Sequence, residues 1–131
     1  MKILNVLSQA FRTTVEEQDE TILWLIQSMM SKAKASSDNM MSLLLSGHAV
    51  YYAFQNQTQP ALTLGDWQQS QPANIKRDIQ QMLDAGISIY LVYEDLWDRG
   101  LDMLPVPAGI DILNRNEIPT LYEYADHIWH W

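Results

Sequence analysis

Polar side chains that could carry chemistry follow apolar runs at four places in the sequence. These are "SQAFR" (8–12), "SGHAV" (46–50), "YEDLW" (93–97) and "NRNE" (114–117). A histidine at such a place can transfer a proton or contact an anion, and two neighbouring carboxylates can act as acid and base. The four stretches therefore define where a functional site is to be sought.

A rule of sheet geometry turns these stretches into one candidate site. If the apolar runs are parallel strands, the ligand crevice lies beyond their carboxyl ends. The predicted ligand-binding residues are Ser8, Gln9, Gly47, His48, Tyr93, Glu94 and Asp95. The same rule nominates Arg12 and Arg115 as neighbours of this set.

His48 follows Gly47 at an expected strand-to-helix turn, where first-turn amides and the helix dipole favour an anion. Two interpretations stay open. His48 acts as an acid, a base or an anion contact, or it is an exposed turn histidine without a catalytic task, which is the commoner case. The turn has no G-x-x-x-x-G-K-[ST] pattern, so a nucleotide phosphate loop is not indicated.

The two acids of "YEDLW" have a structural interpretation as well as a chemical one. Asp95 is placed to cap a short helix, "LWDRG" (96–100), by accepting first-turn amide hydrogens. Gly100 suits the left-handed residue that ends such a helix. Capping is the simpler explanation of Asp95, but it leaves Glu94 unexplained, and an acid–base pair would need a partner across the crevice.

The sequence gives little support for a metal site or for a catalytic cysteine or serine nucleophile. His127 and His130 are three residues apart, so on a strand they point to opposite faces, whereas zinc needs three or four converging ligands. The chain has no cysteine and no G-x-S-x-G elbow. We therefore expect no catalytic residue, no metal site and no cofactor, and an aromatic terminal strand packed in a sheet or an interface.

The elements that must position these residues alternate along the chain. The predicted strands are 2–7, 40–47, 87–93, 110–113 and 128–131, and the predicted helices are 16–34, 48–54, 75–85, 96–100 and 118–127. In the first helix, Ile22, Leu25, Ile26 and Met29 recur at helical spacing, and in the last Leu121, Tyr124 and Ala125 are expected to face inward. Residues 55–73 are expected to form a long surface loop. The alternation predicts one α/β domain over 1–131: a three-layer α/β/α sandwich with a mostly parallel five-stranded sheet.

Composition limits the possible partners. The net charge of −8 disfavours nucleic acid, and no apolar run is long enough for a membrane span, so a cytoplasmic location is expected. Five Trp and six Tyr are many for 131 residues. Aromatic residues are enriched at subunit contacts, which favours self-association through some of Trp67, Trp97, Trp129 and Trp131.

The second half of the chain resembles the DsrE/DsrF/DsrH-like (TusB/TusC/TusD-type) proteins of sulfur-relay systems. The likeness rests on "MLDAGISIYLVYEDLWDRGLD" (82–102) and "GIDILNRNEIPTLYEYADHIWHW" (109–131), and "SGHAVYYAF" (46–54) is similar to the family's second turn. The resemblance implies a five-stranded parallel α/β/α fold assembled into dimers, trimers or hexamers. It also implies a persulfide-carrying cysteine near "YEDLWDRG", which this chain lacks, so the chain looks more like the DsrH/TusB-type members.

Three functions follow from these observations. The first is a non-catalytic subunit or scaffold in a sulfur-relay or related assembly, as a homo-oligomer or together with cysteine-bearing paralogues. The second is a homo-oligomeric small-ligand or anion binder that uses the crevice around His48 and Glu94. The third, a hydrolase or isomerase with His48 as base, rests on fold geometry alone.

Overall fold

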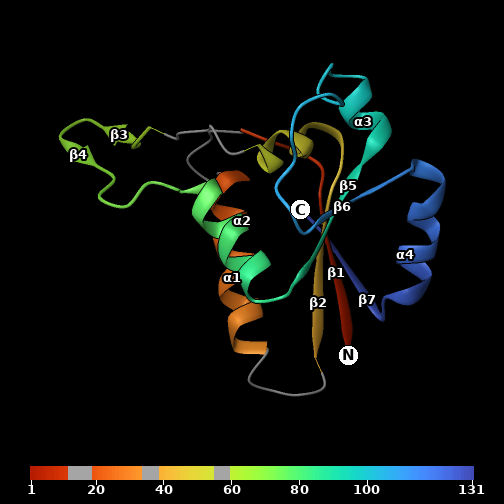
Figure 1. Cartoon of the computed structure of the whole chain (residues 1–131). Coiled ribbons are helices and arrows are strands. Elements are labelled where there is room, and N and C mark those ends of the chain that lie inside the picture. The colour runs from red at the N-terminus through yellow and green to blue at the C-terminus, as the bar shows by residue number, and fades with distance from the viewer. Residues whose placement is uncertain (12–18, 34–38, 55–59) are drawn as a thin grey trace.

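The computed structural model describes residues 1–11, 19–33, 39–54 and 60–131 (Figure 1). Within these ranges the elements are, in chain order, β1 (Lys2–Leu7), α1 (Asp19–Ala33), β2 (Met40–Leu45), η1 (Gly47–Ala53), β3 (Thr63–Leu64), β4 (Trp67–Gln68), α2 (Ile75–Asp84), β5 (Ser88–Val92), α3 (Tyr93–Trp97), β6 (Ile110–Leu113), η2 (Arg115–Glu117), α4 (Ile118–Tyr124) and β7 (His127–His130). The two η elements are 3₁₀ helices.

The main sheet has five strands in the order β6-β5-β2-β1-β7. Every neighbouring pair in it is parallel, for example Leu7 beside Leu45 in β1 and β2, and Leu45 beside Leu91 in β2 and β5. All five carboxyl ends therefore meet at one edge of the sheet. This architecture confirms the predicted α/β fold with a parallel five-stranded sheet.

One face of the sheet is covered by α1, α2 and η1, which lie together on one side of the strands in Figure 1. The core on this side is built from Leu23 and Ile26 of α1, Met82 of α2 and the strand residues Leu43 and Ile89, all fully buried. Burying each such side chain contributes roughly 1.5–3 kcal/mol, so this layer dominates the stability of the fold.

The opposite face is covered by α4 (Figure 1). Leu121 and Ala125 pack there against a small cluster that includes Leu4 and Val92. The expectation that Tyr124 also faces inward is wrong, because 63% of its surface is exposed. Its ring instead lies 3.6 Å from the Lys2 ammonium, a cation–π contact at the rim of the sheet.

Two further expectations are corrected by packing. In α1 the deeply buried side chains are Leu23, Ile26 and Met30, whereas Leu25 is 37% exposed. The buried face of α1 is thus rotated from the predicted one. The apolar residues of α1 can form two different apolar faces at helical spacing, and packing against α2 buries one of them. The predicted loop contains the antiparallel β3–β4 hairpin, and its residues 55–59 lie outside the described part of the chain.

The C-terminal strand is fixed to the rest of the sheet by a buried polar side chain. Asn5 in β1 is fully buried, and its Oδ1 accepts a hydrogen bond from Trp131 Nε1 at 3.2 Å. Its Nδ2 donates to the carbonyl oxygen of Ser42 in β2 at 3.4 Å. A buried amide requires such partners, and here they tie β1 to β2 on one side and to the residue that follows β7 on the other. Among the described residues, no helix is long and apolar enough to cross a membrane.

Candidate functional site at the carboxyl edge of the sheet

The turn after β2 brings the carboxyl ends of β1 and β2 into contact. Gly47 has φ +54°, a left-handed conformation, and a Cβ at this residue would lie 3.0 Å from the carbonyl oxygen of Ser8. That same oxygen accepts the His48 backbone N–H at 3.2 Å. A glycine is therefore needed here both for its backbone conformation and for the close approach of the chain from β1.

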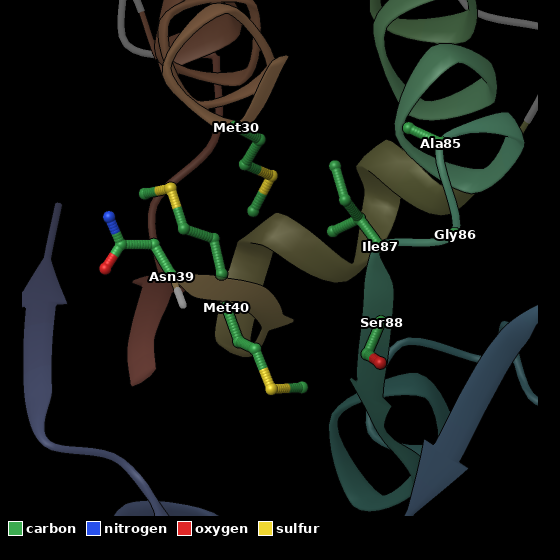
Figure 2. Close-up of a pocket in the computed structure, with 8 residues that line it drawn as sticks. Met30, Asn39, Met40, Ala85, Gly86, Ile87 and Ser88 are labelled. Carbon is green, nitrogen blue, oxygen red and sulfur yellow. The ribbon is translucent and has the colours of Figure 1, made fainter. Parts of the chain in front are cut away.

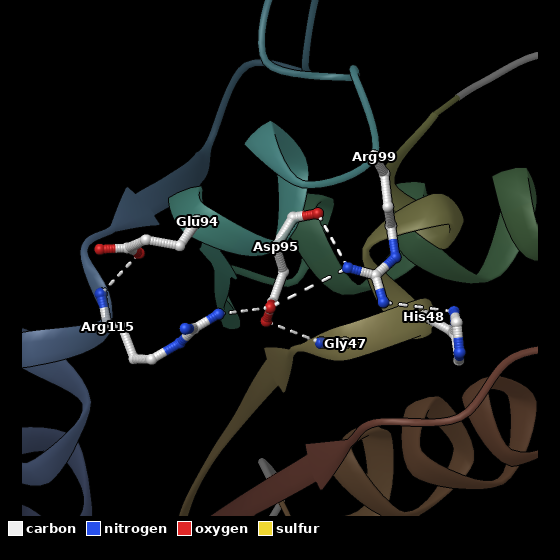
Figure 3. Close-up of polar contacts among 6 residues, drawn as sticks. All are labelled: Gly47, His48, Glu94, Asp95, Arg99 and Arg115. Atoms are coloured by element: carbon white, nitrogen blue, oxygen red, sulfur yellow. Dashed lines mark hydrogen bonds and ion pairs between the residues drawn. The ribbon is translucent and has the colours of Figure 1, made fainter.

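Asp95 is the centre of the site (Figure 3). Its Oδ2 accepts the Gly47 backbone N–H at 2.8 Å, and its Oδ1 accepts from Arg115 Nη2 at 2.7 Å. Arg99 Nη1 lies 4.0 Å from the same Oδ1 and donates to the Asp95 carbonyl oxygen at 3.0 Å. The carboxylate thus joins the turns after β2, β5 and β6 by charge-assisted hydrogen bonds.

The predicted capping role of Asp95 is wrong. Helix α3 begins at Tyr93, directly after Val92, and has no side-chain cap at its start. Asp95 is consequently the third residue of the helix, and its carboxylate is directed to Gly47 and Arg115. Gly100 has the expected left-handed backbone, with φ +67°.

Glu94 orders the turn after β6. Its Oε2 accepts the Arg115 backbone N–H at 2.7 Å, at the first residue of η2. In the same turn Glu117 Oε2 accepts the Asn114 backbone N–H at 2.7 Å. Glu94 and Asp95 therefore bind the main chain and the side chain of one residue, Arg115, which explains why two successive acids stand here.

Arg99 connects this cluster to His48. Its Nη2 lies 3.3 Å from His48 Nδ1. Because a guanidinium can only donate, Nδ1 is the acceptor, and in the neutral imidazole the proton is on Nε2. The Arg99 side chain is 18% exposed, and its Nε is buried without a hydrogen-bond partner among the described residues. His48 itself is exposed, as the commoner of its two interpretations predicts.

On the β7 side of the edge, Ser8 contacts the C-terminal strand. Its Oγ and His130 Nε2 share a hydrogen bond at 3.2 Å, across 122 residues of sequence. The Trp131 backbone N–H continues the pairing of β7 with β1 by donating to the Val6 carbonyl oxygen at 3.0 Å. A Ser–His pair is present, but both residues lie at an exposed sheet edge, and no acid in the described part of the chain is bonded to His130.

The remaining predicted residues take no part in this network. Gln9 is exposed, and Tyr93 is 37% exposed with its ring 6.5 Å from that of Trp97, on the outside of α3. Arg12 lies outside the described residues. The sheet rule thus brings Ser8, Gly47, His48, Glu94, Asp95 and Arg115 to one edge.

Two members of the site were missed as site residues. Arg99 follows Asp95 by four residues, a spacing at which opposite charges meet on a helix, and this signal was available in the sequence. His130 had no such signal, because its contact with Ser8 depends on β7 pairing with β1.

The arrangement favours a structural role over catalysis. Both carboxylate oxygens of Asp95 accept hydrogen bonds, from the Gly47 amide and the Arg115 guanidinium, and Glu94 Oε2 accepts the Arg115 backbone N–H. A general base needs a free lone pair directed at its substrate. In the described ranges, no three His, Asp or Glu side chains converge as metal ligands.

A separate cavity of about 210 Å³ lies at the amino ends of β2 and β5, opposite this edge. Figure 2 shows Met30, Asn39, Ile87 and Ser88 around it. Its wall is largely apolar, and none of its lining residues is charged. It is smaller than the roughly 300–1,000 Å³ typical of ligand pockets, so it resembles a packing gap between α1, α2 and the strands.

Comparison with known proteins identifies the fold. No family model matches the sequence, and no curated protein matches it. Among solved structures, the chain is similar to the ychN protein from E. coli, with a TM-score of 0.74 at 18% sequence identity. The alignment covers 99% of this chain and 98% of that one. The neighbour has a DsrE-like fold, and the mostly parallel five-stranded sheet with its helices matches it over nearly the whole length.

Proposed function

We propose that this chain is a non-catalytic DsrE/DsrH-like protein that serves as a subunit or scaffold in a sulfur-relay or related assembly. Three observations support the proposal: the fold shared with a DsrE-like neighbour, the sequence resemblance around "YEDLWDRG", and the absence of cysteine from the 131 residues. Persulfide transfer requires a nucleophilic thiolate, which neither methionine nor serine supplies at neutral pH.

The observation that carries the proposal is the position of Asp95. It is the third residue of α3, which follows β5 directly, and the resemblance implies a persulfide cysteine near this stretch in the carriers of the family. Here the side chain is 13% exposed and is held by the Gly47 amide and the Arg115 guanidinium. The proposal follows from this difference: an ion-pair network stands near the position where the resemblance implies a reactive thiol in the carriers.

A scaffold of this kind needs a surface for its partner. Tyr93 and Trp97 are 37% and 63% exposed and lie on α3, the same short helix as Asp95. Exposed aromatic side chains are frequent anchors at protein interfaces. We infer that a cysteine-bearing paralogue contacts this helix and thereby brings its own thiol near the ordered edge.

The test is affinity capture of the tagged chain from its native cells, followed by mass measurement of the intact complexes. We expect a complex that contains a cysteine-bearing DsrE/DsrF-like chain. Trp97→Ser should reduce its recovery at least about tenfold, as expected for an aromatic anchor. Trp67→Ser is the matched control, because Trp67 is 54% exposed on the distant β3–β4 hairpin. Recovery of this chain alone, or with partners unrelated to sulfur transfer, would contradict the proposal.

Sulfur chemistry is tested separately. After incubation with a persulfidated donor protein, intact-mass analysis should show no sulfur adduct on this chain. The donor alone is the control for the stability of its persulfide. An adduct of one sulfur mass that depends on the donor would show that the missing-thiol argument is wrong.

The alternative of an anion-binding crevice receives less support. Arg115 is 58% exposed in its side chain, but its guanidinium already pairs with Asp95 at 2.7 Å. Arg99 is close to the same carboxylate and donates to His48. An anion would have to compete with these contacts, which lowers the affinity that the edge can offer.

A further inference from the structure

A second cavity, of about 520 Å³, is bordered by α1, by α2 and by the segment that enters α2. It is lined by Thr21, Trp24, Gln71, Pro72, Ala73, Asn74 and Arg77. It shares no residue with the edge around Asp95. In Figure 1 the amino ends of α1 and α2 lie side by side, where the chain from the β3–β4 hairpin enters α2. Its volume is within the range of small-molecule sites.

The wall formed by α1 is aromatic. Thr21 and Trp24 are three residues apart and lie on one face of the helix. The indole of Trp24 is 51% exposed, although the neighbouring Leu23 is fully buried. Within the described ranges, Trp24 Nε1 has no hydrogen-bond partner. A flat apolar surface with a free N–H is thus presented to the cavity, and Pro72 and Ala73 add apolar surface.

The wall formed by α2 carries one positive charge, from Arg77, in a chain of net charge −8. Lys76 precedes Arg77 in the first turn of α2 but does not line the cavity, and Asp78 follows it. The Arg77 side chain is 50% exposed. Its Nε and Nη2 both lie 3.3 Å from Asp78 Oδ1, which leaves Nη1 without an acceptor in the described part of the chain. The dipole of a ten-residue helix adds to the attraction for an anion at this end.

We propose that this cavity binds a small planar aromatic carboxylate. The ring stacks on the Trp24 indole, and the carboxylate accepts hydrogen bonds from Arg77 Nη1 and from the side-chain amide of Gln71. Aromatic stacking and a charge-assisted hydrogen bond act on two ends of one ligand, so neither an apolar ring nor a carboxylate alone should bind as well.

The probe is 2-naphthoate, titrated into ¹⁵N-labelled protein while the five Trp indole N–H resonances are followed. The Trp24 resonance is assigned by its absence from the spectrum of Trp24→Leu. We expect a saturable shift of the Trp24 signal, with the Trp67 signal unmoved. The neutral 2-naphthamide and the non-aromatic cyclohexanecarboxylate should each bind about tenfold more weakly or worse.

Variants separate the two contacts. Arg77→Gln alone would leave the buried Asp78 carboxylate without its cation, so the variant to use is Arg77→Gln with Asp78→Asn. Measured by saturation transfer from the protein to the ligand, this pair and Trp24→Leu should each weaken 2-naphthoate binding about three- to tenfold. Asp78→Asn alone should bind as tightly as the wild type or tighter, because the guanidinium is no longer shared. Trp67→Leu is the matched control.

The assignment is overturned if the Trp24 signal does not shift saturably. It is equally overturned if Trp24→Leu and the double variant bind 2-naphthoate as the wild type does, or if the three probes bind with equal affinity.

Discussion

Asp95 Oδ2 accepts the Gly47 backbone N–H at 2.8 Å, across 48 residues of sequence. The contact holds the turn after β2 against the helix that follows β5. Because Oδ1 of the same carboxylate pairs with Arg115, one side chain fixes the relative positions of three strand ends. The structural role of the carboxyl edge of the sheet depends on this contact between Asp95 and Gly47.

Replacing Asp95 should therefore destabilise the fold. Asp95→Ala removes the hydrogen bond that the partly buried Gly47 amide donates to the carboxylate. It also removes the ion pair with Arg115, whose side chain is 58% exposed. We expect the free energy of unfolding in urea to fall by about 2–3 kcal/mol, most of it from the Gly47 contact. Asp111→Ala, which removes an exposed acid from β6, should change it by less than about 0.5 kcal/mol. Equal effects of the two substitutions would show that the Asp95 network contributes nothing.

A second prediction isolates the close approach at Gly47. Gly47 and Gly65 have similar left-handed backbones, with φ +54° and +59°. Of the two, only Gly47 would bring an added Cβ within 4 Å of another atom, the Ser8 carbonyl oxygen at 3.0 Å. Gly65→Ala should cost about 1–2 kcal/mol at most, from backbone strain. Gly47→Ala should cost at least about 1 kcal/mol more, because the Ser8 backbone must move. Chemical denaturation of both variants gives the comparison, and matching values would contradict it.

The third prediction concerns Asp78, which is fully buried and has an Oδ2 without a partner among the described residues. Burial raises the pKa of this carboxyl above its ordinary value of 3.8, and the Arg77 guanidinium only partly opposes the effect. Between the ordinary and the raised pKa the folded chain keeps a proton that the unfolded chain releases. The contribution of Asp78 to stability is therefore full below the unfolded pKa and is lost as the pH rises through the folded one.

Asp78→Asn removes this titration. Relative to the variant, the wild type should become progressively less stable as the pH is raised from about 3 to about 7. The free energy of unfolding of both proteins, measured across that range, checks the prediction. Asp84→Asn, near the end of the same helix, controls for the loss of one acid. Parallel curves for wild type and Asp78→Asn would contradict it.

The fourth prediction is self-association through β7. This strand lies at the edge of the sheet, and Ile128 and Trp129 on it are 42% and 39% exposed. An exposed apolar edge strand tends to be covered by another chain. Sedimentation velocity should show a dimer or larger species that Trp129→Ser shifts toward monomer at least about tenfold in dissociation constant. Trp67→Ser is the control, and a monomeric wild type at high micromolar concentration would refute the prediction.

The fold and the location of the edge could both be predicted from the order of residues along the chain. Strand–helix alternation and the apolar runs around Leu44 and Leu91 require a parallel sheet covered on both faces, because strands apolar on both sides cannot face water. Parallel strands align their carboxyl ends, so Ser8, Gly47 and Asp95 had to meet at one edge. The backbone conformation after α3 could also be predicted locally, because Gly100 has the expected left-handed conformation.

What the residues at that edge do depends on the folded arrangement. Local capping was expected of Asp95, but Gly47 and Arg115, 48 and 20 residues away, bind its carboxylate instead. Helix α3 begins at Tyr93, two residues before Asp95. The contact between Ser8 and His130 likewise exists because β7 pairs with β1. A carboxylate accepts hydrogen bonds from whichever donors the sheet brings close to it. The order of the strands decides which donors those are, and the residues that neighbour the carboxylate in sequence do not reveal that order.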